Sequence, residues 1–487
     1  MRSAAWRAVN IHSSPRELQM RGRNLESRKR GSRGRGVAAA RAGIGMRCVP
    51  LALLASAIFF AGTGEAAEKG SFAYEDFERP ETCRSCHNDF YQQWTQAMMS
   101  QAYTHHWDEI EYFELAVPHS RVDPDLIPAQ HGCNGCHAPL AYLAGDVPPP
   151  RPEEGSRANE SVSCDVCHTI RGFEGEQPFN YNYVIEPGRT KFGPKPGQES
   201  PHHDTQQLEF ITQTEFCGTC HNERSPHGAW VKATQIEWQE GPYAEEGVRC
   251  HHCHMPDAIG RSAKMGAEGL VRQHLFHGAH APGKLAGAVE LRMHPDVREV
   301  PYDGVVVFTV QLFNAKAGHK IPTGSVEDRI VWLHVTATDA DGTTYHLPVD
   351  EKGFTGEEYT IAADVLAYQD MGIPLERPDF AGVQRDGIPL GDRIFRMPYL
   401  DPQGRMTIMQ WNTASFGVDY RIGPRETKLE TFTWEMPADI ALGRVTIEAR
   451  LNYQKLVRPV AEFLDVPEDE SEVVEINRTQ TWFEVYD

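Results

Sequence analysis

Ten of the eleven cysteines form five pairs, and two residues separate the partners in each pair. The paired cysteines are Cys83 and Cys86, Cys133 and Cys136, Cys164 and Cys167, Cys217 and Cys220, and Cys250 and Cys253. A histidine follows the second cysteine of every pair, and these histidines are His87, His137, His168, His221 and His254. Thiols and imidazoles in this pattern could bind zinc, exchange disulfides or hold a prosthetic group.

Zinc and dithiol chemistry fit the spacing poorly. A structural zinc site usually joins two such pairs that lie about 15–20 residues apart, whereas successive pairs here begin 50, 31, 53 and 33 residues apart. A redox dithiol is normally single and lies where a strand meets a helix in a βαβ unit. Five copies, each followed by histidine, argue against both interpretations.

Cys-x-x-Cys-His is instead the attachment signature of c-type haem. The two thiols bind the porphyrin covalently, and the imidazole of the next residue binds the iron. We therefore expect five covalently bound haem c groups, attached through the ten paired cysteines, with the five following histidines as proximal ligands. In the last motif, "CHHCH", we interpret His251 and His252 as the two spacer residues, and the alternative is a distal role to a neighbouring haem.

The opposite face of each iron either takes a second ligand or stays open. Two segments contain the strongest distal candidates, "PHHD" before the fourth motif and "HLFHGAH" after the fifth. The candidate histidines are His105, His131, His202, His203, His274, His277, His280 and His319. A surface or hydrogen-bonded role is the alternative for these histidines, and it is the role expected for His334 and His346 on predicted strands.

The elements that must position these residues differ between the two halves of the chain. A helix is predicted over 88–107, where apolar and histidine side chains recur at intervals of three and four residues. Beyond residue 295 there are no cysteines, and alternating strands are predicted. These strands lie within 305–315, 330–347, 429–436 and 444–453. The loop "NAKAGHKIPTG" between the first two strands either brings His319 to a haem or packs the two halves together.

The predicted fold class is multidomain. A haem-packed, sparsely α-helical multihaem cytochrome c domain over 67–294 precedes an all-β immunoglobulin-like sandwich over 295–487. The first domain has long connectors rich in proline and glycine and little regular pattern. We therefore expect the apolar macrocycles to supply much of its core.

The first 66 residues predict export. Residues 46–66 combine a basic residue, an apolar run too short to cross a bilayer and small residues near Ala66, as in a secretory signal peptide. Residues 1–45 are rich in arginine, glycine and serine, and they are either a basic disordered extension or the result of a start codon assigned too early. A periplasmic or cell-surface protein with no integral membrane span after signal cleavage is expected.

The charge of the chain limits its partners. The formal net charge is −20, and the predicted leader is basic, so the exported part is more acidic still. Such a charge repels nucleic acid and favours basic partners. We expect redox partner proteins, such as other cytochromes or quinol-linked complexes, and no nucleic acid; the sequence leaves the oligomeric state open.

Several segments, among them "CNGCHAPLAYLAGD", "SVSCDVCHTI", "EFCGTCHNERSPHG" and "HLFHGAH", resemble exported multihaem cytochromes c of the c-552/c-554 type. That family is related to the pentahaem nitrite reductases and the octahaem hydroxylamine oxidoreductases. The resemblance covers roughly residues 78–285 and implies a helix after the first motif that carries Trp-x-x-Ser-x-His with an axial histidine. Here Trp94 is followed five residues later by Met99. Met99 is therefore a further distal candidate, and this iron is either His/Met ligated or open.

Two functions follow from these features. The first is an exported pentahaem c-type cytochrome that carries electrons along a chain of haems. The second is a multihaem oxidoreductase with one open haem, acting on nitrite, hydroxylamine or a sulfur oxyanion. No motif here has the Cys-x-x-Cys-Lys form of the pentahaem nitrite reductases, which argues against the second. A third possibility is a haem-bearing adhesion or assembly module built around the β-domain.

Overall fold

Short helices carry the cysteine motifs in the computed structural model, which describes residues 67–350 and 385–487. The predicted extension and signal peptide lie outside the described residues. The helices of the motif-bearing half are α1 (Pro80–Arg84), α2 (Asn88–Trp94), α3 (His106–Ile110), α4 (Val117–Val122), α5 (Ile127–His137), α6 (Pro139–Leu143), α7 (Cys164–Thr169), α8 (Thr214–His221), α9 (Thr234–Gln239), α10 (Pro242–Glu245), α11 (Cys250–His254) and α12 (Pro282–Leu285). None of the described helices is long and apolar enough to span a membrane.

Local sequence explains why the motifs are helical. Motifs two to five lie within α5, α7, α8 and α11. Positions i, i+3 and i+4 of a helix share one face. The helix therefore turns the two thiols and the following imidazole of one motif toward the same side.

The predicted single helix over 88–107 is wrong. Helix α2 ends at Trp94, a 3-10 turn spans Met98–Gln101, and α3 begins only at His106. The indole of Trp94 donates a hydrogen bond to the carbonyl of Val162 (2.9 Å), and the amide of Val162 donates to the carbonyl of Met99 (3.0 Å). These tertiary contacts override the local periodicity.

Two-stranded sheets link the motif helices. They pair β1 (Ile170–Phe173) with β2 (Tyr183–Ile185), β3 (Thr190–Gly193) with β4 (Asp204–Gln207), β5 (Asn222–Arg224) with β6 (Trp230–Ala233), and β7 (Asp257–Arg261) with β8 (Glu268–Arg272). These strands are short, so the motif-bearing half contains no extensive sheet among its described residues.

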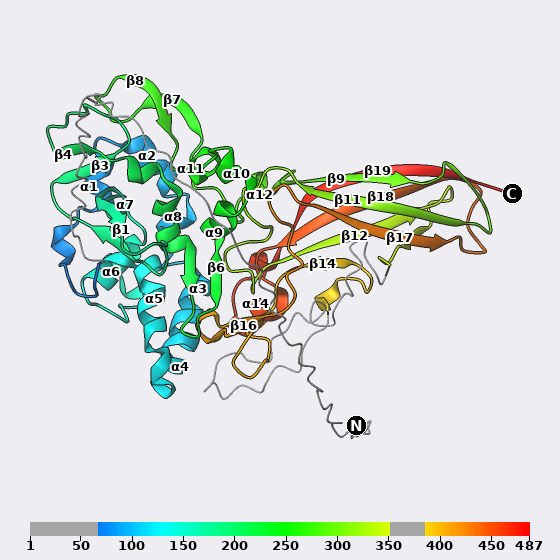
Figure 1. The fold of residues 1–487 in the computed structure, drawn as a ribbon, viewed down its shortest axis with the longest axis horizontal. Helices are drawn as coiled ribbons and strands as arrows, with labels where there is room; N and C mark the ends of the chain where they lie inside the picture. The colour runs from blue at the N-terminus through cyan, green and yellow to red at the C-terminus, as the bar shows by residue number, and fades with distance from the viewer. Residues whose placement is uncertain (1–66, 351–384) are drawn as a thin grey trace, which may run out of the picture. The chain divides into compact units, whose positions relative to one another are not determined.

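The second half of the chain is largely β, as predicted, and its long strands run from green to red in Figure 1. One sheet has the order β17 (Thr427–Glu435), β11 (Val305–Asn314), β9 (Val289–Pro295). The other has the order β10 (Glu299–Pro301), β19 (Val473–Tyr486), β18 (Gly443–Gln454), β12 (Ile330–Thr338), β13 (Thr344–His346), and β14 (Arg393–Phe395) also pairs with β12. This half also contains a two-stranded pair, β15 (Tyr399–Leu400) and β16 (Ser415–Phe416), and helix α14 (Arg458–Leu464). The alternation that predicted the strands buries every second residue of β11, among them Phe308 and Val310, in a core shared by both sheets.

A second core joins the two halves. Trp107, Tyr112 and Leu115 of the first half pack with Trp332 and Met409 of the second. Strand β12 therefore buries residues on both of its faces, whereas β11 buries residues on one face only. Strand β9 runs across the predicted boundary at residue 294.

Candidate haem-binding site

A cavity of about 2280 Å³ runs through the motif-bearing half. All ten paired cysteines and all five following histidines line it. Pockets for one small ligand usually measure about 300–1,000 Å³, so this cavity has room for several prosthetic groups. None of these ten cysteines is joined in a disulfide, so all ten are available for haem attachment.

The proximal imidazoles are held by backbone carbonyl groups. Nδ1 of His87 donates to Ser262 (2.6 Å), Nδ1 of His137 to Ala102 (2.7 Å), Nδ1 of His168 to Phe192 (2.7 Å) and Nδ1 of His254 to His277 (2.6 Å). A hydrogen bond at Nδ1 fixes the tautomer and leaves Nε2 available as the ligand atom. Four of the five predicted proximal histidines are therefore oriented for binding at Nε2.

Three of the proximal imidazoles each face a second imidazole. The ring centroids of His87 and His203 are 6.2 Å apart, with planes inclined by 30°. The corresponding values are 6.3 Å and 21° for His168 and His274, and 6.4 Å and 19° for His254 and His319. With imidazole–metal bonds of about 2 Å, ring centroids on opposite sides of one metal lie roughly 6 Å apart. The three pairs thus have the separation of axial ligands on one iron.

The second imidazole of each pair is also anchored through Nδ1. His203 donates to the carbonyl of Asp204 (3.1 Å), His274 to that of Arg272 (3.0 Å) and His319 to that of Lys320 (2.9 Å). Burial lowers the pKa of His254 and of His274 to about 4. His254 and His274 are therefore neutral at physiological pH, as metal ligation requires.

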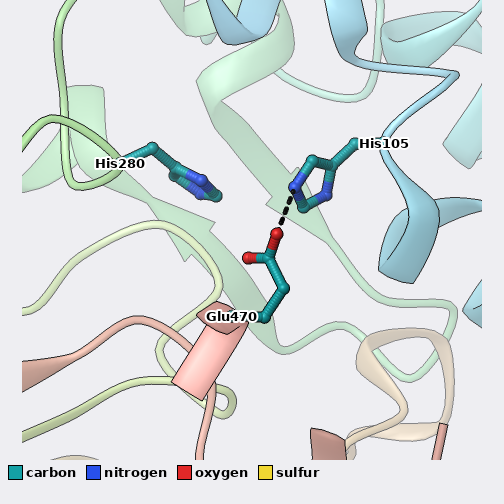
Figure 2. Close-up of side chains that lie close together, drawn as sticks. All are labelled: His105, His280 and Glu470. Carbon is teal, nitrogen blue, oxygen red and sulfur yellow. Dashed lines mark ion pairs between the residues drawn. The ribbon is translucent and has the colours of Figure 1, made fainter. Parts of the chain in front are cut away.

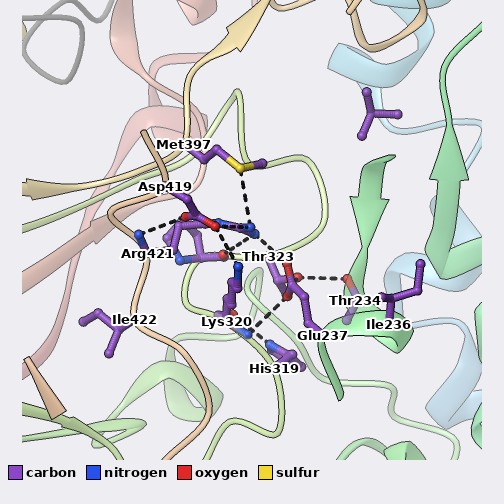
Figure 3. A network of polar contacts seen from close by, with 12 residues as sticks. Thr234, Ile236, Glu237, His319, Lys320, Thr323, Met397, Asp419, Arg421 and Ile422 are labelled. Carbon is purple, nitrogen blue, oxygen red and sulfur yellow. Dashed lines mark hydrogen bonds and ion pairs between the residues drawn. The ribbon is translucent and has the colours of Figure 1, made fainter. Parts of the chain in front are cut away.

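The pairing of His254 with His319 joins the two halves of the chain. His319 lies in the loop between β11 and β12, and a buried polar network holds that loop to helix α9 (Figure 3). Glu237 of α9 accepts hydrogen bonds from the amide of Lys320 (3.2 Å) and the hydroxyl of Thr323 (2.7 Å). Its other oxygen contacts Nη1 of Arg421 at 2.7 Å, and both side chains are about 5% exposed.

His105 and His280 meet each other instead of a proximal histidine. Their rings are 5.5 Å apart in an edge-to-face arrangement, and Nε2 of His105 lies 3.5 Å from Oε1 of Glu470 (Figure 2). Oε2 of Glu470 is 2.5 Å from Nζ of Lys455. Burial lowers the pKa of His280 to about 3, so this histidine is neutral. His280 lines the cavity and His105 does not.

The remaining distal candidates lie in different places. His202 and Met99 line the cavity. His131 lies outside the lining and contacts Nζ of Lys69 through Nε2 (3.4 Å). The exposed His277 contributes its carbonyl group to His254. Their assignment as iron ligands stays a prediction.

His137 and His221 differ from the other three proximal histidines. Among the described residues, no imidazole ring stacks opposite either of them. Burial lowers the pKa of His221 to about 4. Around the second motif lie Lys232, which forms a 2.6 Å ion pair with Glu223, and the buried Glu111, whose pKa is raised by burial.

Thiols of different motifs are neighbours. A hydrogen bond with Cys164 lowers the pKa of Cys83, and one with Cys136 lowers that of Cys220. A hydrogen bond with Cys217 likewise lowers the pKa of Cys250. The attachment points of the first and third, second and fourth, and fourth and fifth motifs are therefore adjacent.

Sequence reasoning missed the groups that hold the imidazoles. The carbonyls of Ala102, Phe192 and Ser262 carry no signal, because every residue has a carbonyl. Glu237 and Arg421 looked like ordinary charged residues, and only their burial reveals the network. The residues present fit haem c: ten cysteines without disulfides line one cavity, the Nε2 atoms of four histidines are available, and three imidazole pairs have the spacing that two ligands of one iron would need.

Comparisons with known proteins agree with this geometry. Residues 82–169, which contain the first three motifs, match the family model of cytochrome c554 and c-prime. The structure is similar to that of a penta-haem cytochrome c552 from Thermochromatium tepidum, with a TM-score of 0.59, 19% identity, and coverage of 84% of this chain and 99% of that chain. The sporulation control protein Spo0M from Bacillus subtilis matches with a TM-score of only 0.16 and 12% identity, over 41% of this chain and 50% of its own. No curated protein matches the sequence.

The family match and the shared fold cover different parts of the chain. The match identifies the first three motifs, and the similar structure extends over most of the chain. Residues 82–169 therefore form a cytochrome c554 and c-prime family domain, and the chain has the fold of a penta-haem cytochrome c552.

Proposed function

We propose that this chain holds five haem c groups and carries electrons between redox partner proteins in the periplasm or at the cell surface. The observation that carries the proposal is the spacing of 6.2–6.4 Å in three imidazole pairs. An iron with two imidazole ligands has no position left for a substrate, so it suits electron transfer. Each haem would be held by the two cysteines and the histidine of its motif.

The neighbouring thiols support an order for the electron path. Cys83 contacts Cys164, Cys136 contacts Cys220, and Cys217 contacts Cys250. The fourth motif thus adjoins both the second and the fifth, and the first adjoins the third. Burial raises the pKa of Cys167 in the third motif, and the charge of the Cys220 thiolate raises it further. Cys167 and Cys220 therefore lie close together. The proposed order is first, third, fourth, with branches to the second and the fifth.

The protein's own groups have defined tasks in this function. Backbone carbonyls orient the imidazoles of His87, His168 and His254 through Nδ1, and burial lowers the pKa of His254 to about 4. Hydrogen bonds to ligand histidines and burial of the site are the means by which a protein sets the potential of a haem. Haem supplies reversible one-electron chemistry when bound.

A second function has its own supporting observation. His137 and His221 have no stacked imidazole opposite them among the described residues, so one of these irons could remain open. Lys232 and the buried Glu111 near the second motif would supply charge and protons to a small nitrogen or sulfur species. This alternative is a multihaem oxidoreductase acting on nitrite, hydroxylamine or a sulfur oxyanion.

Low-temperature EPR of the oxidised protein separates the two functions. A carrier with every iron ligated on both faces gives low-spin signals only. A high-spin signal that changes when nitrite, hydroxylamine or sulfite is added would favour the oxidoreductase. Its absence in the presence of all three would leave electron transfer as the function.

The proposal also covers the redox partners of the chain and the form of its β-rich half. The acidic chain, with a net charge of −20, would dock basic faces of other cytochromes or of quinol-linked complexes. The two sheets that share one core would form an immunoglobulin-like sandwich that presents the loop of His319 to the fifth motif.

A further inference from the structure

Two histidines and a buried aspartate meet at one edge of the larger sheet. Strands β13 and β14 both pair with β12 along the same edge, β13 with Thr336–Thr338 and β14 with Val331–Leu333. His334 of β12 lies at the gap between them. His346 ends β13 and Asp392 immediately precedes β14, so the break in pairing brings all three side chains together.

The contacts within this group are short and direct. Nδ1 of His334 lies 2.9 Å from Oδ2 of Asp392, and Nε2 of His346 lies 2.8 Å from Oδ1. The two imidazole rings are 5.4 Å apart and nearly parallel, with planes inclined by 14°. One candidate ligand atom from each residue lies within 4.8 Å of the others.

Burial distinguishes this group from an ordinary surface cluster. The side chain of Asp392 is fully buried, whereas those of His334 and His346 are 27% and 31% exposed. A buried carboxylate is costly unless a cation or strong hydrogen bonds compensate its charge. Here both of its oxygens face imidazole nitrogens, and the imidazoles themselves are open to solvent on their outer side.

We propose that His334, His346 and Asp392 bind a divalent first-row transition metal ion at the outer edge of the β-sheet. In a tetrahedral site with bonds of 2.0–2.1 Å, ligand atoms are roughly 3.3 Å apart. The two nitrogen–oxygen distances would therefore widen by only about half an ångström. Side-chain rotation alone can supply such a change, because the histidines are not enclosed.

The donor set defines the class of metal. Two imidazoles and one carboxylate suit zinc, copper, nickel and iron(II), while calcium and magnesium prefer oxygen ligands alone. Three protein ligands leave at least one coordination position open to solvent. The site is remote in sequence from all five haem motifs and does not depend on the proposed electron-transfer function.

Zinc binding to the haem-loaded protein tests the proposal. The protein is produced without a polyhistidine tag, dialysed against EDTA and titrated with zinc chloride by calorimetry at pH 7.5. Wild type should bind one zinc ion that His346→Gln and His334→Gln bind at least tenfold more weakly. Zinc-edge X-ray absorption of the wild type should show scattering from two imidazoles.

A matched control and a folding check keep the result interpretable. His294 is an exposed histidine on β9 of the other sheet, so His294→Gln should bind zinc as the wild type does. Unchanged haem absorption and circular dichroism would show that the variants are folded. The proposal is overturned if the wild type binds no zinc, or if the His334 and His346 variants bind it as tightly as the wild type.

Discussion

His254 and His319 face each other across 6.4 Å with ring planes inclined by only 19°. One ends the last Cys-x-x-Cys-His motif, and the other lies in a loop of the β-rich half. Each donates through Nδ1 to a backbone carbonyl, so the Nε2 atoms of both are available to one iron. In the proposed function the β-rich half would therefore supply a haem ligand, in addition to packing against the motif-bearing half.

Replacing His319 by alanine should open the fifth haem. The iron would lose its second imidazole, and its signal would change from low spin to high spin with a shift in reduction potential. EPR of the oxidised variant should show one more high-spin haem per chain than the wild type. His277→Ala is the matched control, because His277 contacts His254 through its carbonyl, which the substitution keeps. Equal spectra for His319→Ala and wild type would contradict the pairing.

The third motif offers an independent test with His274. Its imidazole faces His168, and its amide donates to Oε1 of Gln93 (2.7 Å) on α2. His274→Ala should convert one low-spin haem to high spin. In the double variant with His319→Ala the two changes should add, because the two irons are separate. A double variant with no more high-spin haem than either single variant would show that both histidines serve the same iron.

Adjacent histidines test the first motif. His203 faces His87 at 6.2 Å, and no such pairing links His87 to the neighbouring His202. His203→Ala should therefore produce a high-spin haem, and His202→Ala should leave the spectrum unchanged. The reverse pattern in EPR would reassign the ligand within the "PHHD" segment.

Glu237 should be important for stability because it joins α9 to the loop of His319. Glu237→Gln weakens charge-assisted hydrogen bonds to Arg421 and Thr323, which should cost roughly 1.5–3 kcal/mol. Guanidinium unfolding of the haem-loaded protein measures the change. Glu246→Gln removes an exposed ion pair with Arg425 and should cost about 0–1 kcal/mol. Similar losses in both variants would argue against a special role for the buried network.

Acid should weaken the same network through Asp419. Burial opposes its ionisation, but hydrogen bonds and charge from Arg421, and then from Lys320, lower the pKa of Asp419 to about 2. A carboxyl group whose pKa is lowered in the folded state stabilises the protein at pH values above its unfolded-state pKa, which is 3.8 for Asp419. This stabilisation is lost as the pH falls toward 2. At pH 7 Asp419→Asn should be less stable than wild type by about 2 kcal/mol.

The difference between Asp419→Asn and wild type should shrink as the pH is lowered from 4 to 2, because wild-type Asp419 then becomes neutral too. Guanidinium unfolding curves of both proteins at a series of pH values measure this difference in the free energy of unfolding. A difference that stays constant over this range would show that ionisation of Asp419 does not stabilise the fold.

Most of the long strands were predicted correctly, because alternation depends on local spacing; the haem-attachment residues, also identified by local spacing, stay a prediction. Alternation in β11 and β18 reflects burial of one face, and a Cys-x-x-Cys-His motif is complete within five residues. The segments containing His203, His274 and His319 were also identified. Their pairing could not be predicted, because it depends on where distant segments meet: His203 precedes the fourth motif yet faces the histidine of the first.

One expectation failed for a tertiary reason. The helix over 88–107 is interrupted after Trp94 by contacts with Val162, which lies far along the chain. His334 and His346 are hydrogen-bonded histidines on strands, as predicted, but their shared partner, the buried Asp392, could not be predicted because the edge of β12 brings it to them. Backbone carbonyls that orient the ligand imidazoles have no sequence signal at all.

The most direct test of the account is the number of haems bound covalently to each polypeptide. A pyridine haemochrome assay on the purified, exported protein, combined with quantitative amino-acid analysis, measures it after extraction with acid acetone. We predict five haems per chain, all retained after extraction. A ratio clearly below five, or release of the pigment into the acetone, would contradict the assignment of the five motifs.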